Sequence, residues 1–404
     1  MYLCQCCNPF NSYFETMQKF RNLISGAILS IALTATSVSV ATAAQPTDDS
    51  QNPQVKRSLV FSPGDYESKF YRIPGIVTAK DGSLVAVADK RIETMADLPN
   101  KIDVVARRST DNGATWSDYI TVAKHDSIGG YGDPAIVVDR RSGDILVISS
   151  HGNGLWQKSP AHISISRSKD NGKTWLPAVD INPQILTTAP NGKQPIKCVS
   201  AFASSGGALQ LKNGRIMFAL VTRQPDVKGF KVYAIYSDNG GRKWKVSKNP
   251  GTYDGDESKI VELADGTLIM SIRNRYRGLR NFSYSYDKGA TWSDPVEIPD
   301  LRDPACNGDI IRYGLNGKNI LLQSLPGSPD SRNDVSIYAS LDNGKTWPIK
   351  RIISHCPSAY SAMTILPDGK IGILTEEENP EFPNAYQLWL STVPIDYILS
   401  GTDK

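Results

Sequence analysis

Three arginines in this sequence stand in settings where a guanidinium group could bind an anion. Arg72 lies between an aromatic residue and an Ile-Pro pair at the start of a predicted strand, where a buried charge is unusual unless it is paired. Arg273 follows an aliphatic run, and Arg332 lies in the polar segment 330–334. Three arginines that converge from separate parts of a fold would clamp a carboxylate through planar, bidentate hydrogen bonds. Spacing alone does not separate such a clamp from surface arginines, so the elements that carry them must be identified.

The pattern Ser-x-Asp-x-Gly-x-Thr-Trp, called the Asp box below, is repeated along the chain. Four perfect copies and a fifth, imperfect copy occupy 109–116, 168–175, 285–292, 340–347 and 237–244. A repeat spaced by roughly fifty to seventy residues is typical of a propeller or another array. One carboxylate per copy provides too few ligands for a calcium loop. Ser, Asp and Thr can instead cap a tight hairpin while Gly is left-handed and Trp packs into the core. The boxes are therefore interpreted as structural, and the chemistry is expected in residues outside them.

A second repeat runs in step with the boxes and predicts the architecture. Six turns that end in Gly precede aliphatic runs, at residues 81–82, 142–143, 213–214, 265–266, 316–317 and 368–369. Such dipeptides before aliphatic residues are hairpin signals. The sixth unit ends in a strand-like segment over 386–390 instead of a box. Six units predict an all-β, six-bladed β-propeller with four-stranded antiparallel blades over 57–398, in preference to a β-sandwich array or a parallel β-helix.

The N-terminal segment has the layout of a signal peptide over residues 1–43. Basic residues precede an apolar stretch over 23–40, and small residues follow it. Met17 stands where such a peptide would normally begin, so the preceding residues are a possible mis-assigned start. Cleavage would leave a short linker over 44–56 and a secreted or periplasmic protein. An uncleaved membrane anchor is the alternative, because about eighteen apolar residues nearly span a bilayer.

Composition excludes several other classes of protein. The formal net charge is +4 over 404 residues, and no basic run is interleaved with aromatic residues, so nucleic acid is not an expected partner. Only Cys198, Cys306 and Cys356 follow the predicted signal peptide, which is no disulfide scaffold. The four histidines lack metal-ligand spacing, and no phosphate loop or dinucleotide fingerprint occurs. We therefore expect no metal, no cofactor and no obligatory protein partner.

Together, the Tyr71–Pro74 motif and the four perfect boxes resemble the exo-α-sialidases (neuraminidases) of bacterial type. The resemblance extends over about residues 55–395 and implies the six-bladed sialidase fold. It implies that Arg72, Arg273 and Arg332 form the triad that grips the carboxylate of the substrate.

The same resemblance implies three reacting groups. Tyr360 would be the nucleophile, and Glu257, upstream of the second arginine, would be its base. Asp97 would be the acid/base residue. Asp103 is the alternative in the same loop, but the distance from Arg91 favours Asp97.

Three further residues are implied to support these groups. Arg91 would contact a substrate hydroxyl, and Asp133 would line the pocket. Glu376 would hold Arg72 in place. Because Thr375 stands where the family usually has an aromatic residue, the register could slip to Glu377.

The chemistry of a sialoside agrees with these implied roles. Its anomeric carbon carries a carboxylate, which would repel an attacking carboxylate, and sialidases with a tyrosine nucleophile are an established exception to the two-carboxylate rule. A tyrosine pKa near 10 requires a base within hydrogen-bond reach, which Glu257 can be. Neighbouring arginines would help to lower the pKa of Tyr360. Two displacements at one carbon give net retention.

The sequence thus predicts a retaining exo-α-sialidase that removes terminal sialic acid from glycoproteins, glycolipids and oligosaccharides. One alternative is a trans-sialidase that transfers the sugar or forms an anhydro product. The other is a non-catalytic propeller that binds sialylated glycans.

Overall fold

The computed structural model describes residues 54–157, 159–187, 196–224, 228–315 and 318–402. The predicted signal peptide, most of the predicted linker and the turn at 316–317 lie outside the described residues. The first strand begins at Lys56, which is the last residue of the predicted linker. None of the helices in the described residues is long and apolar enough to cross a membrane.

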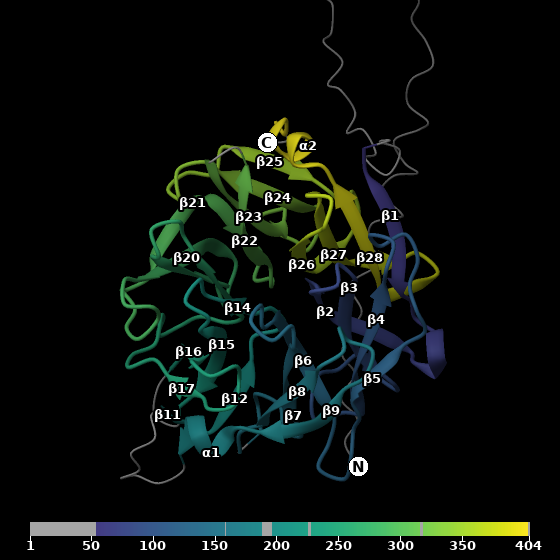
Figure 1. Cartoon of the computed structure of the whole chain (residues 1–404), viewed down its shortest axis with the longest axis vertical. Helices are drawn as coiled ribbons and strands as arrows, with labels where there is room; N and C mark the ends of the chain where they lie inside the picture. Colours follow the sequence, from purple (N-terminus) through teal and green to yellow (C-terminus); the bar gives the residue numbers. More distant parts are fainter. Residues whose placement is uncertain (1–53, 158, 188–195, 225–227, 316–317, 403–404) are drawn as a thin grey trace, which may run out of the picture. The chain divides into compact units, whose positions relative to one another are not determined.

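Six antiparallel sheets follow one another around a central axis, and the predicted six-bladed β-propeller is confirmed (Figure 1). The first blade contains β2 (Phe70–Thr78), β3 (Leu84–Arg91), β4 (Ile102–Ser109) and β5 (Ile120–Ala123). The second contains β6 (Tyr131–Val138), β7 (Ile145–His151), β8 (His162–Ser168), β9 (Leu176–Asp180) and the added β13 (Gly206–Gly207), which is parallel to β6. The third contains β12 (Ser200–Ala203), β14 (Leu209–Gln210), β15 (Ile216–Arg223), β16 (Lys231–Ser237) and β17 (Lys245–Val246).

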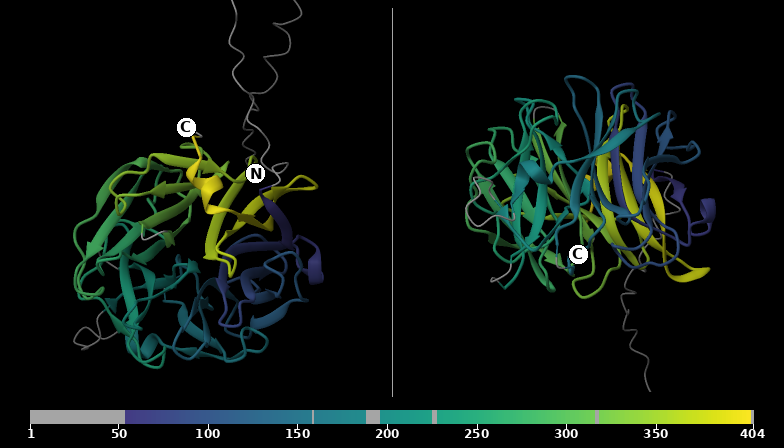
Figure 2. Two further views of the ribbon diagram at one scale, coloured as in Figure 1. Left: turned by 45° about the horizontal axis from the view of Figure 1, so that its top comes forward. Right: turned by 90° about the horizontal axis from the view of Figure 1, so that it is seen from below.

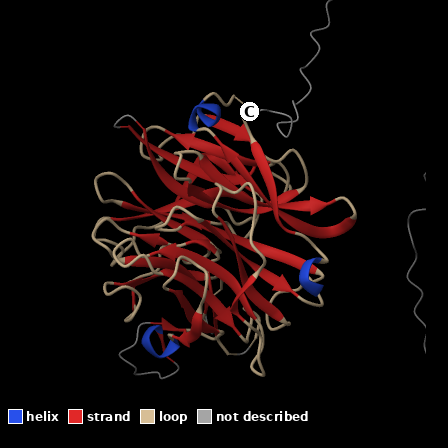
Figure 3. Ribbon diagram, turned by 45° about the vertical axis from the view of Figure 1, so that its right-hand side comes forward, coloured by secondary structure: helices blue, strands red, loops and turns tan. Residues whose placement is uncertain are grey.

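The remaining three blades have four strands each. The fourth contains β18 (Ser258–Glu262), β19 (Leu268–Ile272), β20 (Gly278–Ser285) and β21 (Val296–Asp303). The fifth contains β22 (Asp309–Leu315), β23 (Lys318–Pro326), β24 (Val335–Ser340) and β25 (Ile349–Ile352). The last contains β26 (Ser358–Ile365), β27 (Ile371–Asn379), β28 (Phe382–Val393) and β1 (Lys56–Phe61). Figure 3 shows the strands with the short helices η2 (Asp65–Glu67), α1 (Asn182–Ile185) and α2 (Ile395–Leu399). Outside the blades, β10 (Leu186–Thr187) pairs with β11 (Ile196–Lys197).

The two ends of the propeller meet in one sheet. The first strand, β1, pairs antiparallel with β28, so the purple start of the ring lies beside its yellow end in Figures 1 and 2. Apolar clusters then fill the space between blades. In one of them Leu84 of the first blade packs with Leu388 and Leu390 of the last. Closure of the ring therefore depends on a strand and a core that the repeat pattern does not reveal.

The Asp boxes are hairpin turns held by their own side chains. In the first box Asp111 accepts hydrogen bonds from Thr115 N (2.9 Å) and Thr115 Oγ1 (2.6 Å), and Ser109 Oγ accepts one from Gly113 N (2.8 Å). Asn112 and Gly113 are both left-handed, with φ of 57° and 86°. The other three perfect boxes repeat this geometry. The interpretation of the boxes as structural turns is confirmed.

Three inner strands carry β-bulges near their first residues. The register shifts between Arg72 and Gly75 in β2, between Gly132 and Ala135 in β6, and between Ser358 and Ser361 in β26. A bulge re-aims the side chains of its strand and is common beside active sites. The bulges place Arg72, Asp133 and Tyr360 at one end of the axis.

Candidate active site

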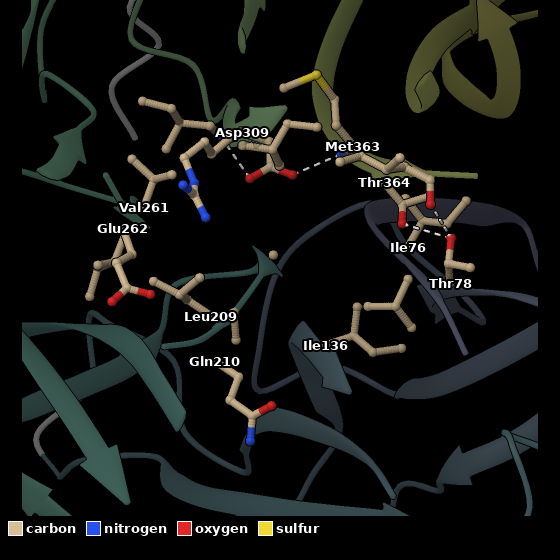
Figure 4. Close-up of a pocket in the computed structure, with 18 of the residues that line it drawn as sticks. Ile76, Thr78, Ile136, Leu209, Gln210, Val261, Glu262, Asp309, Met363 and Thr364 are labelled. Carbon is tan, nitrogen blue, oxygen red and sulfur yellow. Dashed lines mark hydrogen bonds between the residues drawn. The ribbon is translucent and has the colours of Figure 1, made fainter. Parts of the chain in front are cut away.

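A cavity of about 310 Å³ lies at the bulged end of the inner strands. Most of the predicted site residues line it, namely Arg72, Asp97, Asp133, Glu257, Arg273, Arg332 and Tyr360. A larger cavity of about 580 Å³ lies at the other end of these strands, with Ile76, Ile136 and Met363 in its wall (Figure 4). None of the predicted site residues lines that axial cavity, so the candidate site is the smaller one.

Tyr360 and Glu257 form the centre of the site. The Tyr360 hydroxyl donates a hydrogen bond of 2.7 Å to Glu257 Oε2. Arg273 Nη1 bonds the same carboxylate oxygen and lies 2.9 Å from Tyr360 Oη. The three groups come from β26, the residue before β18 and the residue after β19, so two blades build this contact.

Three arginines surround the Tyr360 ring. Their guanidinium carbons lie 5.0 Å (Arg72), 5.9 Å (Arg273) and 5.5 Å (Arg332) from its centroid. Each guanidinium group has five N–H donors, and only some are used within the protein. Arg332 Nη2, for example, donates to the Ala305 carbonyl at 2.8 Å. The clamp predicted from the three arginines therefore has the geometry of an anion site beside the tyrosine.

Glu376 fixes the first arginine, and the register does not slip to Glu377. Arg72 Nε and Nη2 bond Glu376 at 3.0 and 2.8 Å. The amides of Ile73 and Tyr360 also donate to this carboxylate, at 2.8 and 3.2 Å. Glu377 instead accepts two bonds of 2.6 Å from Arg57. Glu376 thus joins the bulge of β2 to the bulge of β26.

The electrostatics of the pair keep the proton on Tyr360. Burial raises the pKa of Tyr360 well above its ordinary value, although Arg273, Arg332 and Arg72 act in the opposite direction. The expected lowering by the arginines is therefore real but is outweighed by desolvation. Burial alone would raise the pKa of Glu257, but Arg273 and its other partners lower it. A protonated phenol thus faces an ionised carboxylate.

Asp97 lies across the cavity and is highly exposed, with 77% of its side chain accessible. Arg91 Nη2 pairs with Asp97 Oδ1 at 2.7 Å. Asp103, the alternative, is buried in β4 and bonds His125 at 2.7 Å, and it does not line the cavity. Of the two carboxylates, Asp97 alone faces the pocket.

Arg91 is buried and makes its contacts behind the cavity wall. Its side chain is only 1% exposed and does not line the cavity. Its nitrogens bond Asp89 (3.2 and 3.0 Å), the Met95 carbonyl and Asp97. This guanidinium lies behind Asp97 and holds it, and the hydroxyl contact that the resemblance implies for Arg91 stays a prediction.

Asp133 lines the cavity beside this group. Its φ is 55°, and its amide donates to Asp89 Oδ1 at 3.1 Å. Burial and the neighbouring carboxylates raise its pKa well above the ordinary value, and burial raises the pKa of Asp89 to about 7. These two carboxyls therefore hold protons more readily than ordinary aspartates.

Several lining residues were not predicted from the sequence. One wall is apolar and contains Leu98, Leu155, Trp156, Phe202 and Phe230. Trp156 is 72% exposed and meets the Phe230 ring edge at 5.7 Å between centroids. These residues lie in irregular loops or at strand ends, where no periodic signal marks them. Asp89 was also missed, although it precedes Arg91 by two residues and so shares its face of the strand.

With this geometry in hand, comparisons with known proteins identify the family. The model of the BNR repeat-like domain matches residues 82–373, which is more than half of the chain. The chain belongs to the BNR repeat-like domain family.

Known relatives of this BNR-repeat protein are sialidases, which confirms the resemblance carried by the motifs. It is 30% identical to a sialidase of Micromonospora viridifaciens over 91% of its own length and 59% of that protein. It is 28% identical to a sialidase of Bacteroides fragilis over 78% of its own length and 61% of that protein. The chain therefore spans about three fifths of each of these two relatives. A solved structure of a Hadza microbial sialidase is also similar, with a TM-score of 0.75 and 28% identity over 85% of this chain and 69% of that one.

Proposed function

We propose that this protein is a retaining exo-α-sialidase that releases terminal sialic acid from glycoproteins, glycolipids and sialyl-oligosaccharides. One observation carries the proposal: the Tyr360 hydroxyl donates to the ionised Glu257 inside a ring of three arginines. A sugar whose anomeric carbon bears a carboxylate would need this combination. The arginines would pair with the carboxylate, and a neutral phenol would approach the carbon without charge repulsion.

The first step follows from the positions of the protons. Tyr360 Oη attacks the anomeric carbon and passes its proton to Glu257, which is already its acceptor at 2.7 Å. Asp97, across the cavity, protonates the departing glycosidic oxygen. The bond to the leaving group breaks, and a covalent sialyl-tyrosine forms.

The second step reverses these roles. Asp97, now ionised, accepts a proton from a water molecule as the water attacks the same carbon. The bond to Tyr360 breaks, and Glu257 returns the proton to the phenol oxygen. Two inversions at one carbon give retention. Arg91 would act through Asp97 because its nitrogens bond that carboxylate and its neighbours.

A fluorogenic α-sialoside tests the proposal directly. We expect the parent protein to release the fluorophore and Tyr360→Phe to lose at least about 10³-fold in kcat, as for loss of a nucleophile. No release by the parent at any pH from about 4 to 8 would exclude the hydrolase. A Tyr360→Phe variant as active as the parent would exclude this nucleophile. Analysis of the products with an added acceptor sugar separates hydrolysis from transfer and from an anhydro product.

We also propose that the protein is exported, since residues 1–43 have the signal-peptide layout described above. The mature chain recovered from the medium or periplasm is expected to begin near Ala44. A chain that keeps its apolar N-terminal stretch in the membrane fraction would contradict cleavage.

A further inference from the structure

A chain of buried polar side chains runs from Glu257 toward the propeller axis. Ser205 Oγ donates to Glu257 Oε1 at 3.1 Å, which is the carboxylate oxygen that Tyr360 does not use. Asn307 Nδ2 donates to Ser205 Oγ at 3.0 Å. Lys259 Nζ donates to Asn307 Oδ1 at 2.8 Å. All three residues are buried. Ser205 directly precedes β13, Lys259 lies in β18, and Asn307 lies shortly before β22.

The amide of Asn307 gives this chain a direction. Its Oδ1 accepts from Lys259 Nζ and also from the Gly308 amide at 3.0 Å, so its Nδ2 must face Ser205. Asn307 Nδ2 donates to Ser205 Oγ, so that hydroxyl is free to donate its own proton to Glu257. Each group of the chain therefore donates one hydrogen bond to the next, and the last of these bonds, from Ser205, orients the Glu257 carboxylate.

The chain ends at a buried cation whose surroundings are shaped to hold it. Lys259 is only 2% exposed and lies in β18, two residues after Glu257. Gly206 has φ of 90°, and a Cβ there would lie 3.0 Å from Lys259 Cε. A Cβ on Gly207 would lie 3.0 Å from Asp309 Oδ1. The two glycines of β13 thus leave room for the lysine and for the aspartate.

Asp309 faces the axial cavity from β22 and is anchored by backbone amides. It accepts 2.9 Å and 2.8 Å bonds from the amides of Ile310 and Met363, the second of which Figure 4 draws. Lys259 interacts electrostatically with both this carboxylate and Glu257. The polar chain therefore ends at a cation that is in the electrostatic range of a carboxylate of the axial cavity.

We propose that Lys259, acting through Asn307 and Ser205, is a positioning residue that holds the Glu257 carboxylate in place and in its ionised form. The proposal rests on the proposed sialidase chemistry, in which Glu257 must accept the proton of Tyr360. Lys259 does not line the candidate site, so it would contribute to the chemistry there only through Asn307 and Ser205.

Charges on every element around the pair support this role. Glu257 faces the cations of Arg273 and Lys259, the phenol of Tyr360, and the carboxyls of Asp256 and Asp133. Lys259 faces Glu257, Asp309, Arg280 and Arg273. Burial lowers the pKa of Lys259 to about 8, so its ammonium persists below that pH. After Arg273, this ammonium is the next cation that favours ionised Glu257.

The pH profile of kcat/KM tests the cation. We expect Lys259→Met to move the acid limb upward by about one pH unit, since Glu257 loses one buried positive neighbour. The alkaline limb should stay in place. An acid limb identical to that of the parent would overturn the role of the cation.

Ser205→Ala tests the hydrogen bond separately and does not disturb the buried charges. We expect kcat to fall about five- to tenfold with KM within about twofold, as for one lost bond to a charged group. Ser283→Ala is the matched control, because Ser283 is equally buried and its hydroxyl bonds only the Ser293 carbonyl, at 2.7 Å. The control should behave as the parent does. An unchanged kcat in Ser205→Ala overturns the proposed relay from Lys259 through Asn307 and Ser205 to Glu257. This test holds even if Lys259→Met does not fold.

An NMR titration separates this proposal from the proposed function. Glutamate labelled with carboxyl ¹³C reports the ionisation of Glu257, with the resonance assigned by its loss in Glu257→Gln. We expect Lys259→Met to raise that titration midpoint, whether or not the protein cleaves a sialoside. A midpoint that does not move rejects the relay, whereas an inactive parent rejects the sialidase.

Discussion

Both the Asp boxes and the bulged inner strands contain left-handed backbone residues, but the boxes are stabilised by local contacts and the bulges by contacts with distant residues. Asn112 in the first box and Ile73 in the first bulge are both left-handed, with φ of 57° and 60°. The box is stabilised by its own side chains, four residues apart at most. The Ile73 amide instead bonds Glu376, 303 residues away.

This difference separates the scaffold from the site. A left-handed asparagine in a turn is common, whereas a left-handed β-branched residue is an outlier that costs on the order of 1–3 kcal/mol. Local bonds repeat wherever the local sequence repeats, so the boxes recur around the ring. The bulges depend on partners in other blades, so each has its own residues. Strain of this kind collects at functional sites, and here the left-handed Ile73 directly follows Arg72, while Asp133 is itself left-handed.

The largest effect is expected at the carboxylate that joins two bulges. Glu376→Gln leaves Arg72 buried without its counter-charge and weakens the bonds to the two bulge amides. Breaking a buried pair in this way costs about 3–5 kcal/mol of unfolding free energy. We also expect kcat/KM to fall at least about a hundredfold, because the first arm of the clamp moves. Urea unfolding and sialoside kinetics measure the two effects.

The adjacent residue is the matched control. Glu377 is also buried and also pairs with an arginine, Arg57, but its carboxylate accepts from no bulge amide and does not line the pocket. Glu377→Gln should cost about 1–3 kcal/mol of stability through its lost hydrogen bonds. Its kcat/KM should stay within about twofold of the parent value. Equal losses of activity in the two variants would show that the bulge contact has no special role.

A smaller effect is expected from breaking one box. Asp342→Ala removes the acceptor of four bonds in the fourth perfect box, from Ser340 Oγ, Lys345 N, Thr346 N and Thr346 Oγ1. We expect a loss of about 1–2 kcal/mol of unfolding free energy, because these groups are exposed enough to bond water instead. Activity of the folded protein should not change. A lower kcat without a lower melting temperature would contradict the separation of scaffold from site.

The sequence predicted the repeated part of the fold well because its causes are local. Each box and each Gly turn is determined by a few adjacent residues, so six units could be counted directly. Strand β1 could not be foreseen from these units, because its partner β28 lies at the other end of the chain. The same limit applies to the fifth strands of the second and third blades, β13 and β14.

The candidate site was predicted where a motif marks it and missed where only packing does. The resemblance implied Tyr360 and Glu257, which the structure brings together although 103 residues separate them. The burial of Arg91 was not foreseen, since burial of a side chain depends on neighbours that sequence spacing does not reveal. Trp156 and Ser205 were missed for the same reason. The arginines lower the pKa of Tyr360 as expected, but the sequence did not reveal that burial outweighs them and raises it.

The smallest effect concerns the charge of the boxes. Hydrogen bonds within its box lower the pKa of Asp111 to about 2. For Asp170 and Asp342 burial acts to raise the pKa, but the hydrogen bonds of the box outweigh it and lower the pKa of each to about 2. An unfolded aspartate has a pKa of about 3.9, so the folded state releases its proton more readily. The resulting stability is present above about pH 4 and is lost as the pH falls through the folded pKa.

Replacement of Asp111, Asp170 and Asp342 by Asn together measures this contribution. Because solvent screens these exposed carboxylates, we expect only about 0.5–1 kcal/mol per box. Urea unfolding of the parent and the triple variant should differ at pH 5, and the difference should shrink steadily toward pH 2. A difference that stays constant over this range would mean that the boxes act through shape and neutral hydrogen bonds. The bulges would then be the part of the propeller where buried charge, and not local geometry, determines the backbone.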